Sequence, residues 1–116
     1  MDASLPVWVC LLYTSLVYAE GSSYQGQPVI LTEYGRISLN TSNDGDKWGY
    51  YENAEDEEEY LARLEIITRK LLKNPLIKGF CYTQMTDVMQ EANGLLTIDR
   101  QPKAEMERLN RIFSGK

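Results

Sequence analysis

Residues 28–32 read PVILT, a short apolar run rich in β-branched side chains, and Glu33 follows it directly. Such an uninterrupted apolar run is typical of a strand that is buried on both faces in a parallel sheet. Residues 77–83, IKGFCYT, read as a second strand of the same kind. We therefore predict two parallel strands, with the carboxylate of Glu33 at the carboxyl end of the first.

A helix is predicted between these strands, over residues 53–73. Acidic residues crowd its first turn and basic residues its last, the signs that suit the helix dipole. An apolar stripe at spacings of four, three and four residues predicts one buried side, made of Tyr60, Leu64, Ile67 and Leu71. Asn74 and Pro75 end the helix.

A second helix is predicted after the second strand, beginning near Pro102. Proline fits the first turn of a helix, where its missing N–H costs nothing. Met106, Leu109 and Phe113 are expected to form the buried side. The order strand, helix, strand, helix predicts an α/β fold with a parallel sheet covered by helices.

Length and composition exclude several classes of protein. The chain has 116 residues, whereas a complete (β/α)₈ barrel needs about 250. The net charge of −5 argues against a nucleic-acid partner. The absence of histidine removes Ser-His-Asp catalysis, and two cysteines cannot supply a four-thiolate zinc site. We expect no metal and no cofactor.

Residues 1–23 do not match the rest of the chain. The apolar stretch at 5–19 is fifteen residues long, which is short for a membrane span of about twenty. It is similar to a signal-peptide core, but the residues before it carry an acid and no base. Residues 10–15, CLLYTS, also resemble the translation of a sequencing-library adapter. We expect residues 1–23 to be non-native or signal-like and residues 24–116 to form the domain, with no compartment assigned.

Polar and aromatic residues after the two strands are the candidate functional groups. Glu33 is the first candidate, because α/β proteins place their sites at the carboxyl edge of the sheet. Gln84 and Asp87 follow the second strand at the same edge, where they either orient a ligand or cap the final loop. Trp48 and Tyr50 lie in a long loop and form either a sugar-stacking platform or the loop's own small core.

Two blocks of sequence resemble glycoside hydrolase family 2, which includes β-galactosidases, β-glucuronidases and β-mannosidases. Residues 25–35, QGQPVILTEYG, are similar to the family's seventh-strand signature. Residues 79–87, GFCYTQMTD, together with NGLL at 93–96 and DRQPK at 99–103, are similar to its eighth-strand region. The likeness runs in one collinear order over residues 24–113.

The resemblance implies a partial (β/α)₈ TIM barrel, namely the last two strand–helix units of a retaining exo-β-glycosidase. Glu33 aligns with the nucleophile that forms a covalent glycosyl-enzyme, and Trp48, Tyr50, Gln84 and Asp87 are expected to contact the substrate. The family's general acid/base is a second glutamate in an Asn-Glu pair, and this chain contains no such pair. The upstream barrel units and the family's sandwich domains are also missing, so we expect the chain to be inactive alone.

The substrate is expected to be a carbohydrate, a neutral β-glycoside, with no membrane partner in the parent enzyme. Glucuronidases resemble one another in an Asn-x-Lys pair that grips the sugar carboxylate, and here that place reads Glu91-Ala92-Asn93. The sequence thus favours a galactoside. Arg36 is a further difference from the family's sequence pattern, because family members often have glycine at this position. The alternative is a small secreted or tethered module that binds carbohydrate without cleaving it.

Overall fold

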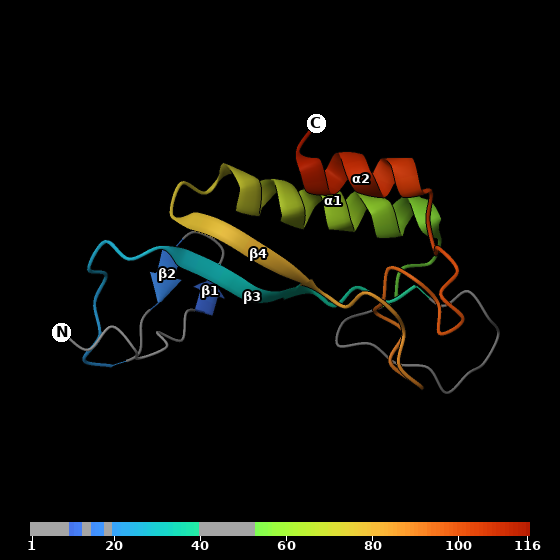
Figure 1. The fold of residues 1–116 in the computed structure, drawn as a ribbon, viewed down its shortest axis with the longest axis horizontal. Helices are drawn as coiled ribbons and strands as arrows, with labels where there is room; N and C mark the ends of the chain where they lie inside the picture. The colour runs from blue at the N-terminus through green and yellow to red at the C-terminus, as the bar shows by residue number, and fades with distance from the viewer. Residues whose placement is uncertain (1–9, 13–14, 18–19, 40–52) are drawn as a thin grey trace.

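The structure is a computed structural model that describes residues 10–12, 15–17, 20–39 and 53–116 (Figure 1). Two short strands, β1 (Cys10–Leu12) and β2 (Ser15–Val17), pair in antiparallel fashion. They are followed by β3 (Val29–Gly35), α1 (Glu57–Lys73), β4 (Ile77–Thr83) and α2 (Met106–Ser114).

The strands β3 and β4 pair in parallel, joined through α1. Val29 lies opposite Ile77 at one end, and Gly35 lies opposite Thr83 at the other. Figure 1 shows α1 packed along one face of this strand pair and α2 beside α1, the two helices running in the same direction. The predicted α/β order of two parallel strand–helix units is confirmed.

The first strand differs from its prediction in length and in burial. It extends through Gly35, so Glu33 lies within the strand rather than after it. Val29 and Tyr34 are buried, but Ile30 is 57% exposed, so the expectation of burial on both faces is wrong. The physical reason is that α1 covers only the face toward which the Tyr34 side chain points.

The helix α1 begins at Glu57, four residues later than predicted. Asp56 caps it, its carboxylate accepting a hydrogen bond from the Glu59 N–H at 2.8 Å. The preceding residues are not helical because the Ala54 N–H bonds to the Ser38 carbonyl at 2.8 Å, which ties that segment to the loop after β3. The predicted end at Asn74 is confirmed.

The helix α2 begins at Met106, and the expected helical position of Pro102 is wrong. Pro102 instead pairs with Leu96 in an isolated bridge, and the Lys103 N–H bonds to the Leu95 carbonyl at 3.1 Å. These contacts hold Pro102 and Lys103 outside the helix, which begins only at Met106. Met106 is accordingly 56% exposed rather than buried.

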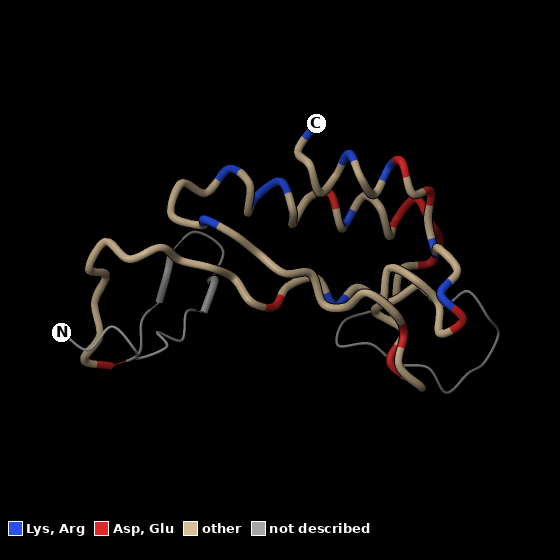
Figure 2. Tube along the Cα trace, viewed as in Figure 1, with Lys and Arg blue, Asp and Glu red and all other residues tan. Residues whose placement is uncertain are grey.

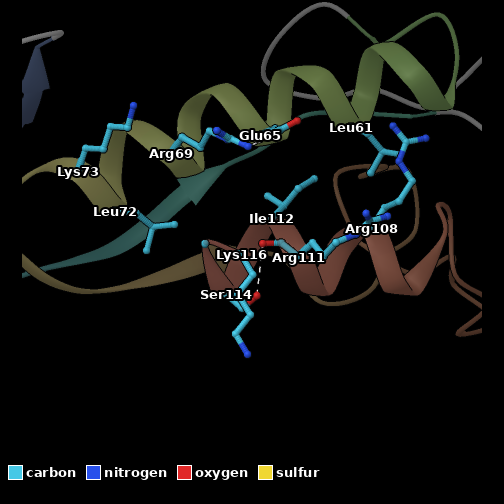
Figure 3. Close-up of a pocket in the computed structure, with 11 residues that line it drawn as sticks. Leu61, Glu65, Arg69, Leu72, Lys73, Arg108, Arg111, Ile112, Ser114 and Lys116 are labelled. Atoms are coloured by element: carbon cyan, nitrogen blue, oxygen red, sulfur yellow. Dashed lines mark hydrogen bonds and ion pairs between the residues drawn. The ribbon is translucent and has the colours of Figure 1, made fainter.

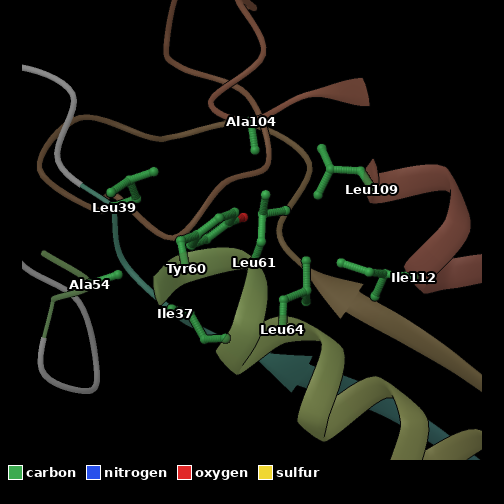
Figure 4. Close-up of a cluster of buried hydrophobic side chains, with 9 residues drawn as sticks. All are labelled: Ile37, Leu39, Ala54, Tyr60, Leu61, Leu64, Ala104, Leu109 and Ile112. Atoms are coloured by element: carbon green, nitrogen blue, oxygen red, sulfur yellow. The ribbon is translucent and has the colours of Figure 1, made fainter. Parts of the chain in front are cut away.

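The hydrophobic core lies between the two helices and the loops that follow β3 and β4 (Figure 4). The predicted stripe on α1 faces it, with Tyr60 and Leu64 fully buried and Ile67 partly so. The complete cluster of buried residues is Ile37, Leu39, Ala54, Tyr60, Leu61, Leu64, Ala104, Leu109 and Ile112. Because loop residues supply part of this cluster, the loops at the carboxyl ends of the strands are packed against the helices.

Charge is divided along the helix layer, as the sequence predicted for α1. Both helices begin with acidic residues and end with basic ones (Figure 2). Each sign is favourable for the partial charge at that helix end. Among the described residues, no helix has both the length and the apolar character that crossing a membrane requires.

Candidate functional site

The carboxyl ends of β3 and β4 lie together, as the parallel pairing predicts. The Arg36 N–H bonds to the Thr83 carbonyl at 3.2 Å, which extends the strand pairing by one residue. Glu33 is two residues before the end of β3, and Gln84 directly follows β4. The structure therefore brings the loops that carry the predicted polar residues to one edge of the sheet.

Glu33 lies in β3 directly before Tyr34, whose side chain faces α1. The hydroxyls of Tyr34 and of Thr68 on α1 are hydrogen-bonded at 3.1 Å. The pairing of β3 with β4 is irregular between Leu31 and Tyr34, so Glu33 lies at a break in the regular alternation of the strand. Its side chain is 58% exposed, and its Oε2 accepts a hydrogen bond from Arg36 Nη2 at 2.7 Å.

Arg36 has a left-handed backbone, with φ of 56°. Glycine adopts this conformation without steric cost, whereas other residues rarely do. This gives a physical account of the glycine that the resembled family often carries here. In this chain, the same backbone places the arginine guanidinium beside Glu33.

Gly35 lets the backbone of β3 approach the ring of Tyr82 on β4. Its φ is 103°, and a Cβ at this position would lie 2.2 Å from the tyrosine ring. That ring also packs edge-on against Tyr34, with centroids 5.5 Å apart, and against Phe113 on α2, at 5.6 Å. The Tyr-Gly pair after Glu33 thus fixes how the two strand ends pack.

Asp87 is held inside the loop that follows β4. Its Oδ1 accepts hydrogen bonds from Lys103 Nζ at 2.6 Å and from the Gly94 N–H at 2.9 Å. Lys103 Nζ also donates to the Ala92 carbonyl at 2.8 Å. These contacts favour the loop-capping interpretation of Asp87 over contact with a ligand. The sequence analysis did not predict a role for Lys103. The only indication was that this residue belongs to the block DRQPK, which resembles the family's eighth-strand region.

Gln84 belongs to a small group of buried polar atoms without partners. Within the described residues, Gln84 Nε2, Asn93 Oδ1 and Ser38 Oγ are buried and make no hydrogen bond. They lie in one region, since the Gln84 N–H bonds to the Asn93 carbonyl and the Leu39 N–H to that of Ala92. Buried polar atoms of this kind are commonly satisfied by an internal water molecule or by a ligand.

The buried Tyr60 and the partly buried Tyr82 lie beneath the same edge. The hydroxyls of Tyr60 and Tyr82 are 3.5 Å apart, and Tyr82 donates to the Asn93 carbonyl at 3.3 Å. Burial raises the pKa of Tyr60 to about 12 and also raises the pKa of Tyr82. Both phenols are therefore neutral at physiological pH and serve as hydrogen-bonding groups.

Trp48 and Tyr50, which were predicted to contact the substrate, lie outside the residues that the structure describes. In the described ranges, no group of three or more His, Cys, Asp or Glu side chains is arranged to hold a metal ion.

Comparison with known proteins gives a structural match. No protein-family profile and no curated protein match the sequence. Among solved structures, the chain is similar to the β-glucuronidase of Bifidobacterium dentium, determined in complex with coumarin-3-O-glucuronide. The TM-score is 0.56, with 26% sequence identity over 78% of this chain, and the match spans 15% of the β-glucuronidase. The chain thus resembles a small part of a glycoside hydrolase family 2 enzyme, and its two parallel strand–helix units are consistent with a piece of a TIM barrel.

Proposed function

We propose that this chain supplies the nucleophile-bearing segment of a retaining β-glycosidase, with Glu33 as the nucleophile. The observation that carries the proposal is the position of Glu33 near the carboxyl end of β3, with its side chain 58% exposed. In a (β/α)₈ barrel the helices lie outside, and catalytic residues come from the carboxyl ends of the strands. The likeness to part of a β-glucuronidase supports this placement.

The chemistry of such a nucleophile follows from the retaining mechanism. One Glu33 oxygen attacks the anomeric carbon while the bond to the leaving oxygen breaks and that oxygen takes a proton from an acid. Water then releases the sugar from the covalent intermediate. In the described structure Arg36 Nη2 donates a hydrogen bond to Oε2 of Glu33, a contact that would orient the carboxylate for attack.

The second carboxyl group is needed for turnover. A retaining site places it about 5–5.5 Å from the nucleophile. The sequence has no Asn-Glu pair, the context in which the resembled family carries this group. General acid catalysis contributes about 10²–10⁴-fold, so we expect the chain alone not to hydrolyse aryl-β-glycosides.

A neutral sugar is the proposed substrate. The place where glucuronidases carry a lysine for the sugar carboxylate has Asn93, which is 1% exposed. The nearby lysine, Lys103, is buried and bound to Asp87 and Ala92. With its ammonium engaged in this way, we expect galactosides to be preferred over glucuronides.

The test transplants residues 24–116 into the matching segment of the B. dentium β-glucuronidase, which supplies the remaining barrel. The chimera is incubated with 2-deoxy-2-fluoro-β-galactoside and 2-deoxy-2-fluoro-β-glucuronide carrying dinitrophenyl leaving groups, and labelled peptides are mapped by mass spectrometry. We expect a glycosyl adduct on Glu33, more from the galactoside, that disappears in Glu33→Gln.

The matched control is Glu65→Gln, which changes an exposed helix carboxylate whose contact is an ion pair with Arg69. It should leave labelling unchanged. An adduct on another residue, or one that persists in Glu33→Gln, would refute the assignment of the nucleophile. Sugar binding by the chimera without any adduct would favour the non-catalytic binding module instead.

A further inference from the structure

The ion pair of Glu33 and Arg36 is not one that regular strand geometry provides. Arg36 Nη2 donates to Glu33 Oε2 at 2.7 Å, although the two residues are three positions apart along the chain. In a regular strand, side chains at this spacing point to opposite faces, and their Cα atoms are about 10 Å apart. The contact therefore requires a local departure from strand geometry.

The backbone between the two residues supplies that departure. The pairing of β3 with β4 is irregular between Leu31 and Tyr34. The next two residues both have positive φ, 103° at Gly35 and 56° at Arg36. A residue other than glycine in the left-handed region carries a conformational cost, and such residues cluster at functional sites. The chain thus has a strained backbone at the position that brings a guanidinium to Glu33.

The arginine is the more firmly held member of the pair. The Arg36 N–H bonds to the Thr83 carbonyl at 3.2 Å, and the next residue, Ile37, belongs to the buried core. The side chain of Arg36 is 32% exposed, whereas that of Glu33 is 58% exposed. We therefore treat the guanidinium as the fixed group and the carboxylate as the group that it orients.

The pair of Glu65 and Arg69 on α1 shows the contrast (Figure 3). These two residues line the groove between α1 and α2 and are four positions apart on one helix. Helical side chains at this spacing are neighbours without any distortion of the backbone. Both are exposed, so their contact is an ordinary surface ion pair. The pair at Glu33, by comparison, depends on the positive-φ residues that end β3.

We propose that Arg36 is a positioning residue for the Glu33 nucleophile, an inference that rests on the proposed function. A carboxylate that attacks an anomeric carbon reacts fastest when one of its oxygens is already aligned with that carbon. The charge-assisted hydrogen bond from Arg36 restricts rotation of the exposed carboxylate before the sugar binds. Glycine, which the resembled family often carries at this position, has no side chain for this task.

The contact is tested in the full 116-residue chain. Carbodiimide and glycine ethyl ester convert accessible carboxyl groups to amides, and mass spectrometry gives the rate at each residue. A carboxylate held by a guanidinium reacts slowly, so we expect Arg36→Gly to raise the rate at Glu33 several-fold and to leave that at Glu65 unchanged. An unchanged rate at Glu33 would show that the pair does not form, and would overturn the proposal.

The role in the reaction is tested in the chimera described above. The measured rate is that of adduct formation on Glu33, as its carboxylate oxygen bonds to the anomeric carbon and dinitrophenolate leaves. Since a misplacement of about 1 Å can cost about 10²-fold, we expect Arg36→Gly to lower the maximal labelling rate by about tenfold or more. The reagent concentration that gives half of this rate should stay the same, because Arg36 acts through Glu33. Millimolar guanidinium chloride should restore part of the rate, whereas sodium chloride should not.

Arg100→Gly is the matched control, since Arg100 is exposed and also has a left-handed backbone, with φ of 62°. Both substitutions relieve the same backbone cost and remove one positive charge, but Arg100 lies in the loop before α2. Its variant should label at the unchanged rate. Equal labelling of Arg36→Gly and the unchanged chimera would overturn the positioning role and leave the nucleophile in place. A chimera that forms no adduct on Glu33 at all would refute the proposed function and this role with it.

Discussion

Lys103 and Asp87 form a buried ion pair, with Nζ 2.6 Å from Oδ1 and side-chain exposures of 0% and 6%. The pair joins the loop after β4 to the segment that leads into α2. The Gly94 N–H and the Ala92 carbonyl complete its hydrogen bonding. A buried pair satisfied in this way holds the loop at the carboxyl edge of the sheet in one conformation.

Removing one partner of this pair should be strongly destabilising. Asp87→Ala leaves the Lys103 ammonium buried without its counter-charge, so we expect the free energy of unfolding to fall by about 3–5 kcal/mol. Urea denaturation followed by circular dichroism measures the change. Glu65→Ala, which removes an exposed pair with Arg69, should cost less than about 1 kcal/mol. Equal effects of the two substitutions would contradict the structural role of the buried pair.

Gly35 and Gly79 offer a matched pair of substitutions in adjacent strands. Gly35→Ala adds a Cβ that would lie 2.2 Å from the Tyr82 ring, at a backbone φ of 103° that alanine rarely adopts. We therefore expect the free energy of unfolding to fall by about 2–4 kcal/mol. At Gly79 the nearest atom would be 3.8 Å away, in Ile30, and alanine should change stability by less than about 1 kcal/mol. Thermal denaturation compares the two variants, and a Gly35→Ala protein as stable as Gly79→Ala would refute the close approach.

Alkaline pH should weaken the fold through Tyr60. Burial raises the pKa of Tyr60 in the folded chain from 10 to about 12. The unfolded chain therefore releases this proton first, and the stability that the neutral phenol contributes is lost as pH rises from about 10 to about 12. The complete loss is about 2–3 kcal/mol, and about half of it should be reached by a pH of about 11, measured as a fall in the urea midpoint between pH values of about 8 and 11.

Tyr60→Phe provides the control for this pH dependence. The variant should lose less stability over the same range, with the remaining dependence due to Tyr82, whose pKa is also raised by burial. An identical fall in the urea midpoint for the variant and the unchanged chain would show that Tyr60 does not carry the effect.

Glu33→Gln should have little effect on stability. The side chain is 58% exposed and its contact with Arg36 is a surface ion pair, which is worth about 0–1 kcal/mol. We expect the free energy of unfolding of the 116-residue chain, obtained from its urea midpoint, to fall by no more than about 1 kcal/mol. A large destabilisation would assign Glu33 a structural role and would weaken its interpretation as a nucleophile.

The sequence was sufficient for the order and pairing of the main elements. The bounds of β4 and the end of α1 agree with the predictions, because an apolar run and the Asn74-Pro75 stop are local signals. The two parallel strand–helix units also follow from the pattern. The resemblance to glycoside hydrolase family 2 was readable from the motifs around Glu33 and Asp87, and the structural match supports it.

The candidate site could be predicted only in part. Parallel pairing indicated that Glu33 and Gln84 would lie at one edge of the sheet, because it brings the carboxyl ends of the strands together. The partners of these residues were not predictable. The ion pair of Asp87 joins residues sixteen positions apart in the sequence, and no local pattern encodes such a contact.

What the sequence by itself determined is therefore the succession of strands and helices, while the role of Glu33 as a nucleophile stays a prediction. Tertiary structure alone decided where helices start and which faces are covered. Pro102 stays extended because the loop after β4 binds its neighbours, and Met106 is exposed because α2 begins there rather than earlier. Propensity acts over a few residues, whereas burial and pairing depend on segments that meet only once the chain has folded.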